Sequence, residues 1–344
     1  MERSGDYLYV VESEASKQLY IFRILSAPAT APANSTGALS ETAVYRLEVP
    51  ADKTPLDPVE RIVGGLSTEL VGNVVLGAPL KRVRIVGDKA FVISSPAYAF
   101  AAGPSDLTDA DETQPPTLFE VDLRDRSNPT VVRSSRLPLE EANDLAVDEK
   151  HVAVSGRGSV LIYELARLDK PKSQIELPQP YGLSLRGGVL FVGCAEGLRI
   201  FDMQQPPVGI GSYACPPVGS VFVGQGRAYL CHPERGVGLE IVDVSKPSEP
   251  RKLGAISGNR DRVYEGLEQP VDVEVRGNLA CVADYCFGLK VFDVSNPARP
   301  RYLGGHFRFS RWWKVVSFRV CTDEDYAFVG LRAAIEFVKL PTGK

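Results

Sequence analysis

Three carboxylate side chains in predicted strands could take part in binding a polar ligand or a cation. Within Val271–Val275 apolar residues alternate with Asp272 and Glu274, and Asp144 lies near the start of an earlier strand-like segment. Successive side chains of a strand point to opposite faces of the sheet, so the apolar residues pack on one face and the carboxylates lie on the other. There each carboxylate must contact water, a cation or an arginine. Calcium could bind at Asp144, Asp272 and Glu274, although no cofactor is required. The alternative to ligand binding is that these acids line a central, water-filled channel and pair there with Arg84 and Arg319.

Two histidines are the candidates for acid–base catalysis. His232 and His306 lie in expected loops, and pairing with Asp284 or Glu274 would make either one a general base. The sequence has three histidines but no H-E-x-x-H motif, no G-x-S-x-G elbow and no phosphate-binding loop. A surface histidine without a catalytic task is the simpler explanation, so the sequence contains no evident catalytic motif.

Aromatic and basic residues could complete a binding surface. Trp312 and Trp313 are surrounded by Arg308, Arg311 and Lys314, and one of the two tryptophans could stack on a ligand. The residues that we expect to contact a ligand are Arg84, Asp144, Tyr181, Asp272, Glu274, Asp284, Tyr285, Trp313 and Arg319.

The cysteines show no spacing that predicts a metal or redox site. None of the six forms a C-x-x-C pair, which favours thiols buried in strands. Cys281 and Cys286 could form a disulfide if the protein is exported.

The elements that position these residues follow from an internal repeat. Segments such as VGLEIVDVSKPSEPRKL, ending at Leu253, and FGLKVFDVSNPARPRYL, ending at Leu303, contain a short apolar strand, an acid, a turn rich in Ser and Pro, and another strand. The repeat length is roughly 40 to 50 residues, which is typical of propeller blades. The anchoring acids are Asp122, Glu164, Asp202, Asp243 and Asp293.

A second pair of strands precedes each acid, as in VDVEVRGNLACVAD from Val271. The two strands are joined by Gly-Asn, Gly-Gly or Gly-Asp, which accept the positive φ of a tight hairpin. We therefore predict an all-β chain forming a single seven-bladed β-propeller, with four antiparallel strands per blade. The expected blades are residues 18–80, 81–138, 143–178, 180–216, 217–257, 270–309 and 313–340, the last one closed by the N-terminal strand 7–12. Alternatively, Gly5–Leu25 contains the middle two strands of a degenerate blade.

Two of the repeats support a family resemblance. GLEIVDVSKPSEP from Gly238 and GLKVFDVSNPARP from Gly288 resemble the LVIVD-repeat family. The resemblance implies a β-propeller. It carries no catalytic residue, because the motif is structural.

Loop lengths predict which face of the propeller is functional. In a four-stranded blade the connections between second and third strands, and between consecutive blades, lie on one face. The long segments Ser95–Pro116, Cys231–Val237, Ser257–Gln269 and Gly305–Trp313 all fall there. Long loops on a rigid scaffold often carry binding residues, although they could also be tolerated insertions.

Two classes of function remain open on this evidence. One is a monomeric module that binds a protein, peptide, glycan or small polar molecule on the loop-rich face. The other is a hydrolase, lyase or isomerase acting at the channel mouth, with or without a divalent cation. The formal charge of −4 and pI of about 5.6 disfavour nucleic acid as a partner, and no apolar run suits a membrane span. As it stands the sequence predicts a cytoplasmic protein, whereas the resemblance suggests export with a leader removed.

Overall fold

The computed structural model describes residues 1–11, 17–25, 44–48, 67–95, 114–204, 206–258, 266–306, 317–322, 325–331 and 334–340. These residues form β-strands and a short 3₁₀ turn, η2 (Tyr285–Phe287), but no α-helix. They fall into two compact units: of the described residues, those within 1–23 and 68–185 belong to the first unit, and residues 24–25, 44–48, 67 and those from 186 onward belong to the second. No helix in the described ranges has the length and apolarity needed to cross a lipid bilayer.

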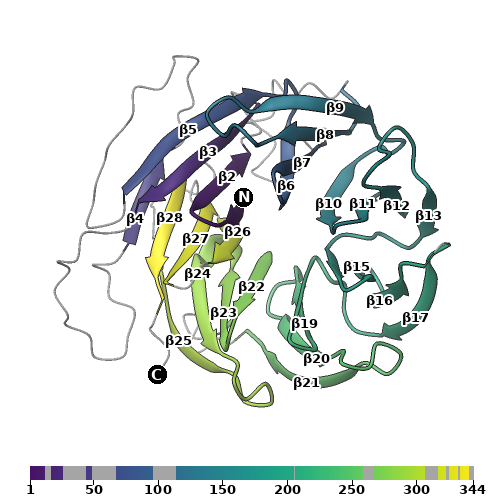
Figure 1. Ribbon diagram of the computed structural model, residues 1–344. Coiled ribbons are helices and arrows are strands. Elements are labelled where there is room, and N and C mark those ends of the chain that lie inside the picture. The colour runs from purple at the N-terminus through teal and green to yellow at the C-terminus, as the bar shows by residue number, and fades with distance from the viewer. Residues whose placement is uncertain are drawn as a thin grey trace, which may run out of the picture. The chain divides into compact units, whose positions relative to one another are not determined.

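The first unit contains four-stranded sheets in the orders β1-β2-β3-β5, β6-β7-β8-β9 and β10-β11-β12-β13 (Figure 1). Their strands are β1 (Glu2–Ser4), β2 (Tyr7–Val11), β3 (Gln18–Leu25), β5 (Ser67–Val75), β6 (Leu80–Val86), β7 (Lys89–Ser94), β8 (Thr117–Asp122), β9 (Thr130–Arg136), β10 (Ala142–Val147), β11 (His151–Gly156), β12 (Ser159–Glu164) and β13 (Ser173–Glu176).

The second unit contains sheets in the orders β14-β15-β16-β17, β18-β19-β20-β21, β22-β23-β24-β25 and β26-β27-β28-β4, with the first residues of β14 still in the first unit. Their strands are β14 (Leu183–Arg186), β15 (Val189–Cys194), β16 (Gly197–Asp202), β17 (Val208–Tyr213), β18 (Ser220–Gly224), β19 (Arg227–His232), β20 (Gly238–Asp243), β21 (Arg251–Ile256), β22 (Asp272–Arg276), β23 (Leu279–Ala283), β24 (Leu289–Asp293), β25 (Arg301–His306), β26 (Ser317–Thr322), β27 (Tyr326–Leu331), β28 (Ala334–Lys339) and β4 (Val44–Glu48).

Within each unit the sheets pack on one another as blades do. The first strands of consecutive sheets lie side by side: β1, β6 and β10 in the first unit, and β18, β22 and β26 in the second. Apolar side chains fill the space between sheets; Tyr9 and Ile21 of one sheet, for example, share a buried cluster with Val83 and Val92 of the next. Burying this apolar surface is the main force that holds the blades together.

The predicted turns are present where the repeat places them. Asp243 Oδ1 accepts the backbone N–H of Ser245 at 2.9 Å, and Asp293 does the same with Ser295. These Asx turns stop the third strand of a blade and reverse the chain. Gly277 has a φ of 55°, which suits the tight hairpin expected between β22 and β23.

The Ser/Pro turn also contacts the preceding blade. A Cβ added to Gly254 in β21 would lie 1.9 Å from the Pro297 carbonyl oxygen, and one added to Gly211 in β17 would lie 1.9 Å from that of Pro247. The outer strand of one sheet therefore needs glycine where the next sheet's turn packs against it.

The all-β propeller class with four-stranded antiparallel blades is thus confirmed, but the predicted closure by the N-terminal strand is not. Tyr7–Val11 lies between β1 and β3, as the degenerate-blade alternative expected, and β4 supplies the fourth strand beside β28. The turn at Gly5-Asp6 lets β2 pair with the adjacent β1, and a short loop closes at a lower entropic cost than a pairing across the whole chain. The prediction of a single ring of seven blades depends on how the two units are placed relative to one another, so it stays a prediction.

Candidate functional site

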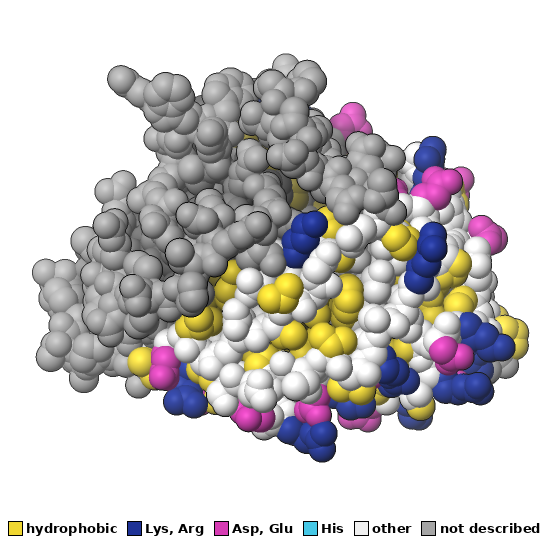
Figure 2. Space-filling model, turned by 90° about the horizontal axis from the view of Figure 1, so that it is seen from above, with side chains coloured by type: hydrophobic (Ala, Val, Ile, Leu, Met, Phe, Trp, Pro, Cys, Tyr) yellow, Lys and Arg dark blue, Asp and Glu magenta, His cyan; other side chains and the backbone are white. Residues whose placement is uncertain are grey.

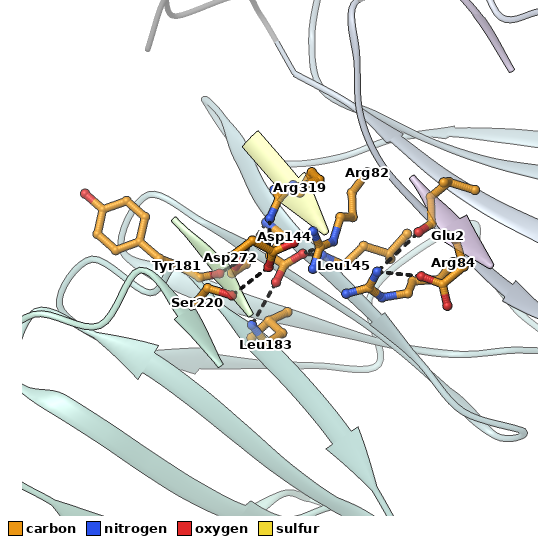
Figure 3. Close-up of polar contacts among 12 residues, drawn as sticks. Glu2, Arg82, Arg84, Asp144, Leu145, Tyr181, Leu183, Ser220, Asp272 and Arg319 are labelled. Atoms are coloured by element: carbon orange, nitrogen blue, oxygen red, sulfur yellow. Dashed lines mark hydrogen bonds and ion pairs between the residues drawn. The ribbon is translucent and has the colours of Figure 1, made fainter. Parts of the chain in front are cut away.

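Asp144 of the first unit joins neighbouring first strands. It is 4% exposed, its Oδ1 lies 2.8 Å from Arg82 Nε, and its Oδ2 accepts the Leu183 backbone N–H at 3.0 Å (Figure 3). The backbone N–H of Asp144 donates to Ser155 Oγ, which in turn donates to the Tyr181 carbonyl at 2.5 Å. A buried carboxylate is stable only when it is paired and hydrogen-bonded, and Asp144 meets both conditions through contacts with β6 and β14.

Asp272 repeats this arrangement in the second unit. Its Oδ1 accepts a hydrogen bond from Ser220 Oγ at 2.9 Å, and its Oδ2 accepts the Val320 backbone N–H at 3.2 Å (Figure 3). Arg319 Nη1 lies 3.7 Å from Oδ1, so the expected ion pair with this arginine is present. Because Ser220 is in β18 and Val320 in β26, one carboxylate links three consecutive first strands.

The remaining residues predicted around the channel are more accessible. Arg84 Nη1 contacts Glu2 Oε2 at 2.9 Å, and Tyr181 is half-buried, with its ring directed away from the Asp144 carboxylate in Figure 3. Glu274 is half-buried in β22. Both oxygens of the two aspartates have protein partners, and calcium binding by Asp144, Asp272 and Glu274 stays a prediction.

A fully buried ion pair lies beneath three loops of the second unit. Lys290 Nζ is 2.7 Å from Asp284 Oδ2, and both side chains are 0% exposed. Lys290 also donates to the Gly266 carbonyl, while Asp284 accepts the backbone N–H groups of Glu268 at 3.1 Å and Gln269 at 2.6 Å. Asp284 holds a loop segment in place through these hydrogen bonds, and its predicted contact with a ligand stays a prediction.

The three loops are connected to one another as well. The described residues of these loops, which we call the loop cluster, are 233–237, 257–258, 266–271 and 284–288. Gly236 N–H donates to the Glu268 carbonyl at 2.7 Å, and Gly258 N–H donates to the Gly236 carbonyl at 3.3 Å. Leu267 N–H donates to the Ser257 carbonyl at 3.3 Å. Loops joined in this way have few conformations to lose when a partner binds.

The accessible side chains of the loop cluster include aromatic and charged groups. Tyr285 and Phe287 are half-buried, Cys286 is exposed, and the Arg235 side chain is 75% exposed with Nε 3.6 Å from Glu268 Oε2. Burial and the nearby Asp284 raise the pKa of the Cys286 thiol, which disfavours a nucleophilic role. The cluster therefore offers contact surface rather than an activated nucleophile.

His232 lies near the loop cluster in sequence but is inaccessible. It is 0% exposed at the end of β19, and its Nδ1 lies 3.1 Å from the Pro217 carbonyl oxygen. A carbonyl only accepts hydrogen bonds, so Nδ1 carries the proton. An imidazole without solvent access is poorly placed to act as a general base on a bound substrate.

Other predicted positions lie outside the described residues. These are Trp313 with its neighbour Trp312, and most of the segments Ser95–Pro116 and Gly305–Trp313. For His306, only the backbone, at the end of β25, is described. Their roles in binding or catalysis stay predictions.

Neither Lys290 nor Arg235 was predicted as a site residue. The sequence around Lys290 nevertheless indicates an unusual environment. A lysine within the otherwise apolar run Leu289–Phe292 can only be buried with a partner or be turned out of the sheet, and the structure shows the first arrangement. Arg235 shows no comparable pattern.

Consecutive four-stranded antiparallel sheets, with first strands side by side and turns packed on the preceding sheet, define a β-propeller. The LVIVD repeat pattern matches residues 229–256 and 270–305, which cover β20, β21, β22, β23 and β24 and most of β19 and β25. Residues 229–256 and 270–305 therefore contain LVIVD repeats, and the described sheets have the arrangement of β-propeller blades. Its sequence has no match among curated proteins.

Solved structures share the fold at low sequence identity. Sqt1 of Chaetomium thermophilum, bound to the N-terminus of ribosomal protein L10, matches with a TM-score of 0.60 at 11% identity, covering 98% of this chain and 82% of that one. A chain of the mitotic checkpoint complex matches with a TM-score of 0.58 at 10% identity, covering 92% and 93%. Hsv2 of Kluyveromyces lactis matches with a TM-score of 0.53 at 12% identity, covering 77% and 81%.

Proposed function

We propose that this propeller is a binding protein whose loop cluster recognises a peptide segment of another protein. The observation that carries the proposal is the buried Asp284–Lys290 pair, which together with the backbone hydrogen bonds above it holds three loops in one arrangement. A surface that is already ordered in the free protein loses less conformational entropy when a partner binds, so more of the contact free energy contributes to affinity.

The composition of the loop cluster supports this proposal. Tyrosine and arginine are the residue types, with tryptophan, that most often carry binding energy at protein interfaces, and Tyr285 and Arg235 are both accessible. Tyr285 has a φ of 26°, a value that non-glycine residues rarely adopt. Such backbone conformations persist where the surrounding structure enforces them, and they are concentrated at functional sites.

The position of the loops agrees with the predicted loop-rich face. Residues 233–237 connect β19 to β20, residues 284–288 connect β23 to β24, and residues 257–271 lead from β21 to β22. In sheets of this strand order all three connections lie at the same end. The wider prediction, one ring of seven blades with the site on one face, forms part of the proposal.

Electrostatics and the comparisons favour a peptide over a strongly charged ligand. Figure 2 shows one side of the molecule, on which hydrophobic and uncharged groups are interspersed with charges of both signs. With a net charge of −4, the chain has no large excess of one sign. Among proteins of the same fold, Sqt1 was solved with the N-terminus of another protein.

The catalytic alternative finds less support in the described residues. His232 is buried, and the Asp284 carboxylate is occupied by Lys290 and two backbone N–H groups. We therefore place a hydrolase, lyase or isomerase function second.

A peptide selection against the full chain tests the proposal. Peptides displayed on phage are selected on the immobilised protein, and the affinity of the enriched sequence is then measured for two arginine variants. Arg235→Ala should weaken binding about 5- to 30-fold, the loss typical of an interface hot spot. Arg251→Ala is the matched control, because its side chain is also exposed, at 76%, and also pairs with a glutamate, Glu249 at 3.2 Å. Failure to enrich any sequence, or equal effects of the two variants, would contradict the proposal.

A further inference from the structure

Three side chains with metal-binding atoms meet between two sheets of the second unit, and none of them belongs to the buried ion pair beneath the loop cluster. Cys215 follows β17, while His232 ends β19 and Glu240 lies in β20. One atom from each, a sulfur, a ring nitrogen and a carboxylate oxygen, lies within 4.8 Å of the other two. The three residues therefore connect the sheet that ends in β17 to the sheet that contains β19 and β20.

His232 supplies an independent indication of a ligand. Its Nδ1–H donates to the Pro217 carbonyl, which leaves a lone pair on Nε2. Nε2 is buried, the residue is 0% exposed, and this nitrogen has no hydrogen-bond partner among the described residues. Buried acceptors without a donor are rare in proteins and call for an explanation. Metal-binding histidines have this arrangement, since their second nitrogen usually donates to a carbonyl or carboxylate.

Glu240 is held by neighbours that still leave it able to bind a metal. Tyr213 Oη donates to Glu240 Oε2 at 2.9 Å, and Lys252 Nζ lies 2.5 Å from Oε1. Each carboxylate oxygen has two lone pairs, so each can accept one such hydrogen bond and retain capacity for a cation. The two neighbours fix the orientation of the carboxylate, as residues outside the coordination sphere do at known metal sites.

We propose that Cys215, His232 and Glu240 bind a zinc ion. A thiolate and an imidazole disfavour calcium and magnesium, which prefer oxygen ligands, whereas zinc is commonly bound by cysteine, histidine and carboxylates. Ligand atoms of a tetrahedral zinc site lie roughly 3.5 Å apart, as follows from Zn–ligand distances of about 2.0–2.3 Å. The ligand atoms, which now lie within 4.8 Å of one another, must therefore approach one another by about 1.3 Å at most.

The binding step is a replacement of a proton by the metal. The Sγ–H bond of Cys215 breaks, the proton leaves to solvent, and a zinc–sulfur bond forms while His232 and Glu240 donate lone pairs. Three protein ligands leave the fourth position for water. Half-buried Cys215 and Glu240 give the ion a route from solvent. The ion would fasten two adjacent blades together.

Zinc uptake by the full, untagged chain tests this site. The protein is stripped with a chelator, zinc chloride is added, and bound metal is measured by mass spectrometry and by competition with a chromophoric chelator. We expect about one zinc ion per chain. Cys215→Ser should bind at least 100-fold more weakly, and Glu240→Gln at least 10-fold more weakly, because even residues outside the coordination sphere change affinity 10- to 100-fold.

Cys286→Ser is the matched control, since Cys286 is an exposed thiol that is not one of the three proposed zinc ligands, and this variant should bind zinc as the wild type does. Cobalt chloride gives a readout that needs no variant: a thiolate-to-cobalt charge-transfer band in the near ultraviolet should appear in the wild type. Absence of this band, less than about a tenth of an equivalent of zinc in the wild type, or equal affinity in Cys215→Ser would overturn the proposal.

Discussion

Replacing Lys290 with methionine removes the cation beneath the loop cluster while keeping a side chain of similar length. The Asp284 carboxylate would then be buried, at 0% exposure, with only the two backbone N–H groups as partners. Breaking a fully buried ion pair costs about 3–5 kcal/mol, because an uncompensated charge remains. The segment from Gly266 to Gln269 also loses the hydrogen bond from Nζ to its first carbonyl.

Native-state hydrogen exchange reports this loss at the amides concerned. The N–H groups of Glu268 and Gln269 donate to Asp284, so their protection should fall by about two to four powers of ten in Lys290→Met. Replacing both members of the pair by apolar residues should restore much of the global stability but leave these two amides unprotected.

Lys246→Met is the matched control for this variant. Lys246 pairs with Glu249 at 2.6 Å, but the two side chains are 65% and 48% exposed, so its loss should cost less than about 1 kcal/mol. Unchanged protection of Glu268 and Gln269 in Lys290→Met, or an equal effect of both variants, would refute the reasoning.

Two further variants test the other electrostatic contacts. Asp144→Ala removes the buried carboxylate that pairs with Arg82 and should lower the free energy of unfolding by about 3–5 kcal/mol. Glu140→Ala, in an exposed pair, should cost less than about 1 kcal/mol, and urea denaturation that ranks the two variants equally would count against an inter-strand role for Asp144. Hydrogen bonds from Arg124 hold the pKa of Asp122 at about 2, below the usual value near 3.9, so its stabilising contribution is present above about pH 4 and lost as the pH falls towards 2. Asp122→Asn should therefore lose slightly less Tm than the wild type between pH 4 and pH 2, and a steeper loss in the variant would show that the sign is wrong.

Local features of the fold could be predicted from the sequence because they depend on adjacent residues. The hairpin at Gly277 requires only a glycine that accepts positive φ, and the turns after Asp243 and Asp293 require only an acid two residues before an N–H group. The place of Val44–Glu48 beside β28 could not be predicted in this way. That pairing joins distant parts of the chain, and the segment VYRLE would suit many sheet edges equally.

The place of the loops in the chain could be predicted from the sequence better than the contacts within them. Asp284 and Tyr285 do belong to a loop cluster, but the burial of Asp284 depends on Lys290, whose charge would normally place it at the surface. Likewise, the sequence contains no spacing that brings Cys215, His232 and Glu240 together, because the packing of two sheets does so.

The most direct test of the proposed function is a hydrogen-exchange footprint of the full chain with and without a saturating selected peptide. Added protection should fall on residues 233–237 and 284–288, while the Ser/Pro turns at 245–249 and 295–299, at the other end of the same sheets, should exchange as in the free protein. Protection confined to those turns, with the loop cluster unchanged, would contradict the assignment of binding to these loops.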